Sequence, residues 1–76
     1  MIVSIEYCTA WNYLPRAAGL ANDLLDKYGT DIKELTLIPS GGGVFEVIRN
    51  GELIFSKKAL DRHADKGEVL ALFEGV

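Results

Sequence analysis

The residue with the most distinctive chemistry is Cys8, which comes directly after a β-rich segment and shortly before a helical one. A cysteine near the amino end of a helix lies in a positive field, and such a field favours the thiolate. The thiolate is the nucleophile in disulfide exchange and in the reaction with peroxides. A second interpretation stays open, since free cysteines are also among the most buried residues and Cys8 could be an apolar plug.

Trp11 places a large amphipathic ring in the loop that follows Cys8, and Tyr13 and Leu14 extend it into an apolar rim. Aromatic anchors of this kind are enriched at the hot spots of protein interfaces. The ring could equally fold back over the helix and shield Cys8, since tryptophan is mostly buried on average. If the rim is exposed, this end of the molecule is a docking surface for a partner or for a second copy.

A run of small residues, 40–43, lies between two predicted strands. It precedes a strand and lacks both the helix N-terminus and the lysine that a phosphate cradle uses. We therefore expect a flexible loop near Cys8 in which glycines, Gly42 among them, let the backbone of a partner approach.

Other polar residues have weaker claims to a functional role. His63 has no second histidine or cysteine at ligand spacing, so we expect a surface residue and no metal site. Ser56, Asp61 and His63 are the residue types of a hydrolase triad, but no strained nucleophile turn accompanies them. Lys57 and Lys58 would either contact an acidic partner or protect an edge strand from aggregation as a solvated pair.

The elements that must position these residues follow from the hydrophobic pattern. Residues 2–7 are β-rich and alternate, with Val3, Ile5 and Tyr7 on one face, which predicts a strand. This strand would deliver Cys8 to its C-terminal end.

A helix is predicted over residues 13–28, where apolar side chains recur at intervals of three and four. Asn12 is expected to cap its first turn, Pro15 is tolerated there, and Gly29 permits a left-handed end. The predicted apolar stripe consists of Leu14, Ala17, Ala18, Ala21, Leu24, Leu25 and Tyr28.

Residues 35–38 predict a short second strand, after which Pro39, with a trans peptide bond, begins a loop. Because a long helix connects the first two strands, they should be parallel. Apolar residues within 69–73 predict a short last helix, with Asp65 and Glu68 as a capping box.

A β-hairpin is predicted where residues 44–49 and 52–56 flank the pair at 50–51, Asn-Gly, which suits a two-residue type I′ turn. Such a turn places Arg49 opposite Glu52, which pairs opposite charges. The predicted order is β-α-β-β-β-α, an α/β two-layer arrangement in which helices cover a mixed four-stranded sheet.

Length and composition agree with one domain over residues 1–76, because 76 residues can enclose only one core. The net charge of −3 argues against a nucleic-acid partner, and no segment is long enough for a membrane span. A single cysteine cannot form an internal disulfide, and no secretory leader is recognised, so a reducing cytoplasmic location is expected. The sequence leaves the oligomeric state open.

Three segments together resemble the selenoprotein W-type family (the SelT/SelW/SelH or Rdx family), and their order and spacing span nearly the whole chain. Tyr7–Trp11 occupies the place of that family's Cys-x-x-Cys or Cys-x-x-selenocysteine loop. Pro39–Val47 is similar to its proline-containing loop and Gly-x-Phe-Glu-Val strand. Asn50–Lys58 resembles its turn followed by Ser-Lys-Lys.

The resemblance implies a thioredoxin-like fold, thiol-based redox activity, and association with glutathione or a partner protein. Cys8 matches the first redox cysteine of the family, but Trp11 stands at the second redox position. A dithiol mechanism is thereby excluded, and a mixed disulfide on Cys8 must be released by an external thiol. No bound cofactor is implied, with glutathione as the candidate co-substrate. The alternative is a non-catalytic binding module that uses Trp11, Tyr13 and Gly42.

The redox interpretation depends on the placement of one atom. The sulfur of Cys8 is expected to be open to solvent beside the amino end of the long helix.

Overall fold

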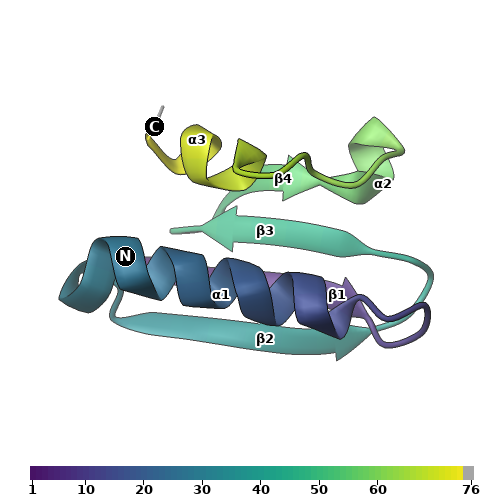
Figure 1. The fold of residues 1–76 in the computed structure, drawn as a ribbon, viewed down its shortest axis with the longest axis horizontal. Coiled ribbons are helices and arrows are strands. Elements are labelled where there is room, and N and C mark those ends of the chain that lie inside the picture. The colour runs from purple at the N-terminus through teal and green to yellow at the C-terminus, as the bar shows by residue number, and fades with distance from the viewer. Residues whose placement is uncertain (75–76) are drawn as a thin grey trace.

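The computed structural model describes residues 1–74, and Figure 1 shows their arrangement. In chain order the elements are β1 (Ile2–Cys8), α1 (Leu14–Tyr28), the 3-10 turn η1 (Gly29–Asp31), β2 (Glu34–Ser40), β3 (Phe45–Arg49), β4 (Glu52–Ser56), α2 (Lys57–Leu60) and α3 (Glu68–Glu74).

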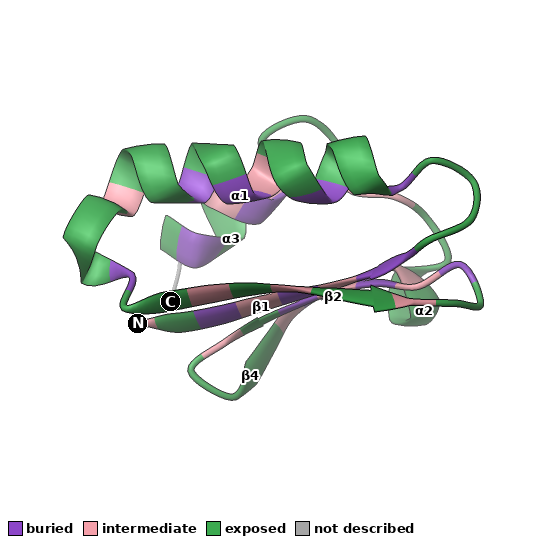
Figure 2. Cartoon of the chain, turned by 90° about the horizontal axis from the view of Figure 1, so that it is seen from below, coloured by how far each residue is buried: buried purple, intermediate pink, exposed green. Residues whose placement is uncertain are grey.

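The four strands form one mixed sheet in the order β2-β1-β3-β4. β1 is parallel to β2 and antiparallel to β3, and β3 is antiparallel to β4. Helices α1 and α3 lie on the same face of this sheet, and the buried positions face the space between the two layers (Figure 2). The predicted α/β, thioredoxin-like fold with a mixed four-stranded sheet is confirmed, and α2 is an addition to the predicted order.

β1 is a central strand whose side chains alternate between the two faces of the sheet. Val3, Ile5 and Tyr7 are buried, as the alternation predicted. The strand continues one residue further than expected and ends with Cys8. Cys8 is therefore held by strand pairing rather than lying in the loop.

α1 begins at Leu14, directly after Tyr13, which occupies the N-cap position without a side-chain hydrogen bond. The predicted cap, Asn12, is wrong, because its backbone lies in the left-handed region at φ 62° and belongs to the preceding turn. Pro15 lies in the first turn, as predicted. Gly29 ends the helix at a positive φ of 52°, but its ψ of −126° lies outside the left-handed helical conformation that was predicted.

The predicted apolar stripe of α1 is too wide. Ala17, Ala21 and Leu24 are buried against the sheet, whereas Leu14 and Leu25 are half exposed. A helix that lies flat on a sheet buries a narrow strip, so the flanking leucines remain at its edges.

β2 is longer than predicted and includes Pro39, which was expected to begin a loop. The proline pairs with Tyr7 through its backbone position, and its peptide bond is trans, as expected. Proline is tolerated here because β2 is an edge strand with one side free of strand pairing.

The β3–β4 hairpin is confirmed. Asn50 and Gly51 have φ values of 50° and 81°, as a type I′ turn requires, and Arg49 pairs with Glu52. An irregularity after Val47 shifts the register further along the ladder.

Two short helices follow β4 in a region where only the second was expected. The hydroxyl of Ser56 accepts a hydrogen bond from the backbone N–H of Ala59 at 3.0 Å and caps α2. Before α3, the Glu68 carboxylate accepts a hydrogen bond from the backbone N–H of Asp65 at 2.9 Å, which is one half of the predicted capping box. Arg62 donates two further hydrogen bonds to Glu68, and they hold the pKa of that carboxyl at about 2.

Candidate functional site

Cys8 lies where three elements meet at one end of the sheet. Its backbone N–H donates to the carbonyl oxygen of Val44 at 2.9 Å, and the N–H of Thr9 donates to the carbonyl of Ser40 at 2.9 Å. Ser40 ends β2, and Val44 directly precedes β3. The glycine loop, residues 41–43, therefore spans from one neighbour of Cys8 to the other.

The side chain of Cys8 is 1% exposed and belongs to the main hydrophobic cluster. The expectation of a solvent-exposed sulfur is therefore wrong. The reason is that β1 continues through Cys8 and keeps the residue within the sheet. In this conformation the apolar-plug interpretation describes the cysteine.

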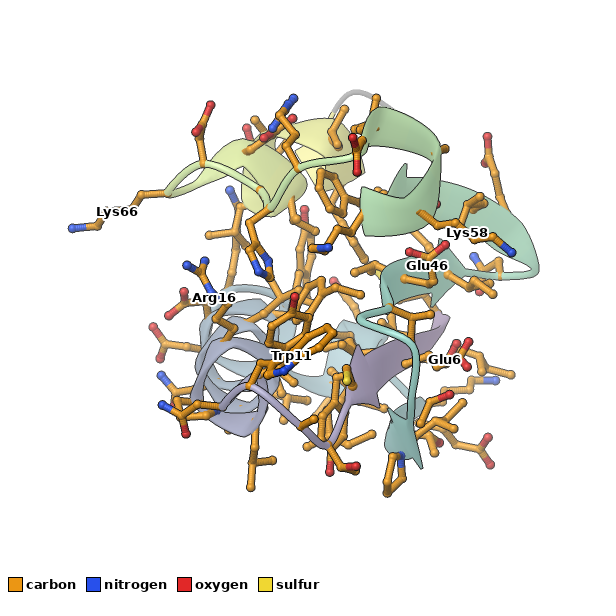
Figure 3. The ribbon with its side chains drawn as sticks, turned by 90° about the vertical axis from the view of Figure 1, so that its right-hand side faces the viewer. Glu6, Trp11, Arg16, Glu46, Lys58 and Lys66 are labelled. Carbon is orange, nitrogen blue, oxygen red and sulfur yellow. The ribbon has the colours of Figure 1, made fainter. Side chains whose placement is uncertain are left out.

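Trp11 lies in the turn of residues 9–12, which separates Cys8 from the start of α1, and its side chain is 73% exposed. The alternative of a buried tryptophan is therefore wrong. Figure 3 shows Trp11 at the end of the molecule where α1 begins, between Arg16 on one side and Glu46 on the other. Trp11 and Asn12 have φ values of 59° and 62°, a left-handed conformation that is uncommon for residues other than glycine.

The six-membered ring of Trp11 lies close to Gly43 in the glycine loop. A Cβ on Gly43 would come within 2.9 Å of the Trp11 Cζ3 atom, and Gly43 has φ 74°. Gly42, at φ 70°, is exposed and has open space around it. The contact residue is therefore Gly43, which the sequence did not distinguish from its neighbours.

Tyr13 was expected in an exposed rim, but it is buried, with 7% of its surface accessible. Its ring packs edge-on against His63, with 4.6 Å between the ring centroids, and the ammonium of Lys57 lies 5.8 Å from its centroid. The Trp11 ring is tilted against it at 6.3 Å. Tyr13 is therefore a buried residue that packs beneath the exposed Trp11 ring. Leu14, which is 50% exposed, remains on the surface.

His63 is half-buried rather than a surface residue, because its ring contacts Tyr13 and lies 6.5 Å from the ring of Phe45. Burial lowers the pKa of His63 below 6.5, and the cations Arg16 and Lys57 lower it further. Loss of solvation and nearby positive charge both disfavour the imidazolium.

We expect an NMR titration of His63 to give a pKa below 6.5, and Lys57→Gln to raise it by removing one cation. This lowered pKa makes stability depend on pH. As the pH falls below about 6.5, His63 is protonated in the unfolded chain before it is protonated in the folded one. The free energy of unfolding therefore decreases until the pH passes the pKa of His63 in the folded protein. Lys33→Gln, at the opposite end of β1, is the control. An unchanged pKa in Lys57→Gln would contradict the assigned cause.

The triad of Ser56, Asp61 and His63 is not formed. The hydroxyl of Ser56 donates to Glu46 at 2.5 Å and caps α2, so it is committed to structure. Lys57 and Lys58 lie in α2, directly after Ser56, which ends the edge strand β4.

Within residues 1–74, no group of three or more His, Cys, Asp or Glu residues is placed to hold a metal ion. No helix in this part of the chain has the length and apolar character needed to cross a membrane.

Comparisons with known proteins agree with this architecture. A protein from Bordetella parapertussis has a solved structure with a TM-score of 0.88 at 30% identity, over 97% of this chain and 94% of that one. A selenoprotein W-related protein from Vibrio cholerae gives a TM-score of 0.87 at 27% identity, over 97% and 92% of the two chains. A search of curated proteins gives no match.

The family model described as the Rdx family matches residues 2–74, which include all four strands of the sheet and helices α1, α2 and α3. Together with the selenoprotein W-related neighbour, the match suggests a redox-type role. This chain therefore belongs to the Rdx family of selenoprotein W-related proteins.

Proposed function

We propose that this chain is a thiol redox protein that works through Cys8 alone, and that its thiol reacts only when the turn of residues 9–12 moves aside. The observation that carries the proposal is the contrast within this short segment. The one thiol of the chain is 1% exposed, and the turn that directly follows it is exposed throughout.

The turn has the features of a segment that opens without unfolding the domain. Its one backbone hydrogen bond to another segment, within residues 1–74, is that of Thr9 to Ser40. Trp11 and Asn12 are held at positive φ, which costs on the order of 1–2 kcal/mol for each residue. Release of that strain lowers the free energy of local opening, and weakly bonded segments of this kind open more often than the core.

The chemistry of an open Cys8 is ordinary disulfide exchange. The Cys8 thiolate attacks one sulfur of glutathione disulfide, a bond forms between Cys8 and glutathione, and one glutathione thiolate leaves. Because Trp11 occupies the second redox position, a second glutathione thiolate, or a thiol of a partner protein, must attack the mixed disulfide. That step releases the Cys8 thiolate and forms a new disulfide.

The proposal includes a reducing cytoplasmic location, because a lone free cysteine suits that compartment. Glutathione is a co-substrate in it rather than a bound cofactor.

The test is the urea dependence of the rate at which a thiol reagent modifies Cys8 in the folded protein. Local opening exposes little surface, so we expect a dependence much weaker than that of global unfolding, measured on the same sample. The Cys8→Ser variant gives the background rate. A urea dependence equal to that of global unfolding would refute the proposal, because the thiol would then react only in unfolded chains.

A second function is favoured by the exposure of Trp11, which is 73%. In this alternative the chain is a non-catalytic binding module, and Trp11 docks a partner protein without thiol chemistry. Pull-down of a partner that survives Cys8→Ser and fails with Trp11→Ala would support it. Loss of the interaction with Cys8→Ser would support the redox function instead.

A further inference from the structure

We infer that the surface beside Trp11 binds an acidic segment of a partner protein, with Lys57 contacting a carboxylate and the Trp11 ring contacting an apolar side chain. The inference deepens the proposed function, on which it rests for the use of this end of the molecule. It is carried by a hollow, by an unpaired cation and by the charge of the surroundings.

A hollow of about 380 Å³ opens next to the glycine loop. Its wall at Gly43 is also the surface on which the Trp11 ring lies, so the ring and the hollow are adjacent. The hollow is lined by Gly42, Gly43, Val44, Lys57, Lys58 and Asp61. Gly42 is exposed and has no side chain, which leaves its backbone open to a bound chain, whereas Gly43 is buried beside the Trp11 ring.

Lys57 is the cation closest to the Trp11 contact. Its ammonium nitrogen lies 3.9 Å from the position that a Cβ on Gly43 would occupy, and 5.8 Å from the centroid of Tyr13. Within residues 1–74 the ion pairs are Lys27–Glu74 and Arg62–Glu68, so Lys57 has no carboxylate within ion-pair distance. A charge held over an aromatic ring without a counter-ion can bind an incoming carboxylate at little rearrangement cost.

The residues that line the hollow carry a net positive charge, on a protein whose net charge is −3. Lys57 and Lys58 outnumber Asp61 on its wall. Arg16 and Glu46 lie on either side of Trp11 at the same end of the molecule, and the Glu46 carboxylate accepts a hydrogen bond from Ser56 (Figure 3). The lowered pKa of His63, caused in part by Arg16 and Lys57, reflects the same field. A local positive patch on an acidic protein favours a short acidic peptide, because a long polyanion such as a nucleic acid meets repulsion from the remaining surface.

The test uses the Cys8→Ser protein and two peptides, acetyl-Glu-Glu-Leu-Glu-Glu-amide and its counterpart with glutamine in place of glutamate. Trp11 is the sole tryptophan, so its fluorescence reports contact directly. We expect the glutamate peptide to bind about tenfold more tightly than the glutamine peptide, and the difference to shrink as salt is added. Lys57→Gln should remove most of the difference, and Lys33→Gln should leave it unchanged.

Equal binding of the two peptides, or an unchanged affinity in Lys57→Gln, would overturn the inference, as would preferential binding of a single-stranded oligonucleotide. The binding test uses the Cys8→Ser protein, so its result does not depend on the reactivity of the thiol. Failure to bind the acidic peptide together with locally gated thiol reactivity refutes the inference alone. Binding together with a thiol that reacts only on global unfolding refutes the redox proposal and retains the acidic docking surface.

Discussion

Replacing Tyr13 with alanine is expected to reduce the free energy of unfolding by about 3–5 kcal/mol, as is typical when a buried aromatic ring is removed. Tyr13 is buried, and it supports the rings of Trp11 and His63 from below. For a domain of this size, 1 kcal/mol corresponds to about 4–8 °C in melting temperature, so the shift should be large. Urea unfolding followed by circular dichroism measures it.

The matched comparison is Trp11→Ala, which should change stability by no more than about 1 kcal/mol because its ring is mostly exposed. Tyr13→Phe keeps the buried ring and removes the hydroxyl alone, so it should behave like the unmodified protein. If Tyr13→Ala and Trp11→Ala reduce the free energy of unfolding equally, the assignment of a structural role to Tyr13 and a binding role to Trp11 is wrong.

The parts of the fold that could be predicted are those set by local chemistry. The alternation of Val3, Ile5 and Tyr7 fixed the face of β1 that meets the helices. Asn50 and Gly51 specified a turn in which both residues need positive φ. These signals work because each depends on the backbone of a few neighbouring residues.

The predictions that the structure contradicts depend on contacts between segments far apart in the sequence. The sequence could not show that β1 continues through Cys8, because that depends on pairing with Ser40 and on a hydrogen bond to Val44, both far along the chain. The inclusion of Pro39 in β2 likewise depends on its edge position in the sheet.

The candidate site was predicted in its location but not in its exposure. Cys8, Trp11 and the glycine loop were expected at one end of the sheet, and the structure brings them together there. The burial of Tyr13 and His63 was not predicted. The two rings contact each other only because the start of α1 packs against the segment that follows α2. The type of each residue alone does not show that Tyr13 and His63 are neighbours in the fold.

Gly43→Ala should displace the Trp11 ring, whereas Gly42→Ala should not. Both glycines are left-handed, so both variants are expected to lose about 1–2 kcal/mol from backbone strain. At Gly43 alone the new Cβ would meet the Trp11 Cζ3 atom at 2.9 Å, and because the ring is exposed it can rotate away. We expect a shift of Trp11 fluorescence in Gly43→Ala and a spectrum close to the original in Gly42→Ala.

The same pair of variants links the tryptophan to the thiol. If the Trp11 contact with Gly43 holds the turn of residues 9–12 closed, Gly43→Ala should speed modification of Cys8 more than Gly42→Ala does at equal stability. In a Trp11→Ala background the difference between the two glycine variants should vanish, because the colliding ring is gone. Equal modification rates in the two variants, with Trp11 present, would show that the contact between Trp11 and Gly43 does not control access to Cys8. The strained backbone of residues 9–12 would then be the feature that controls opening.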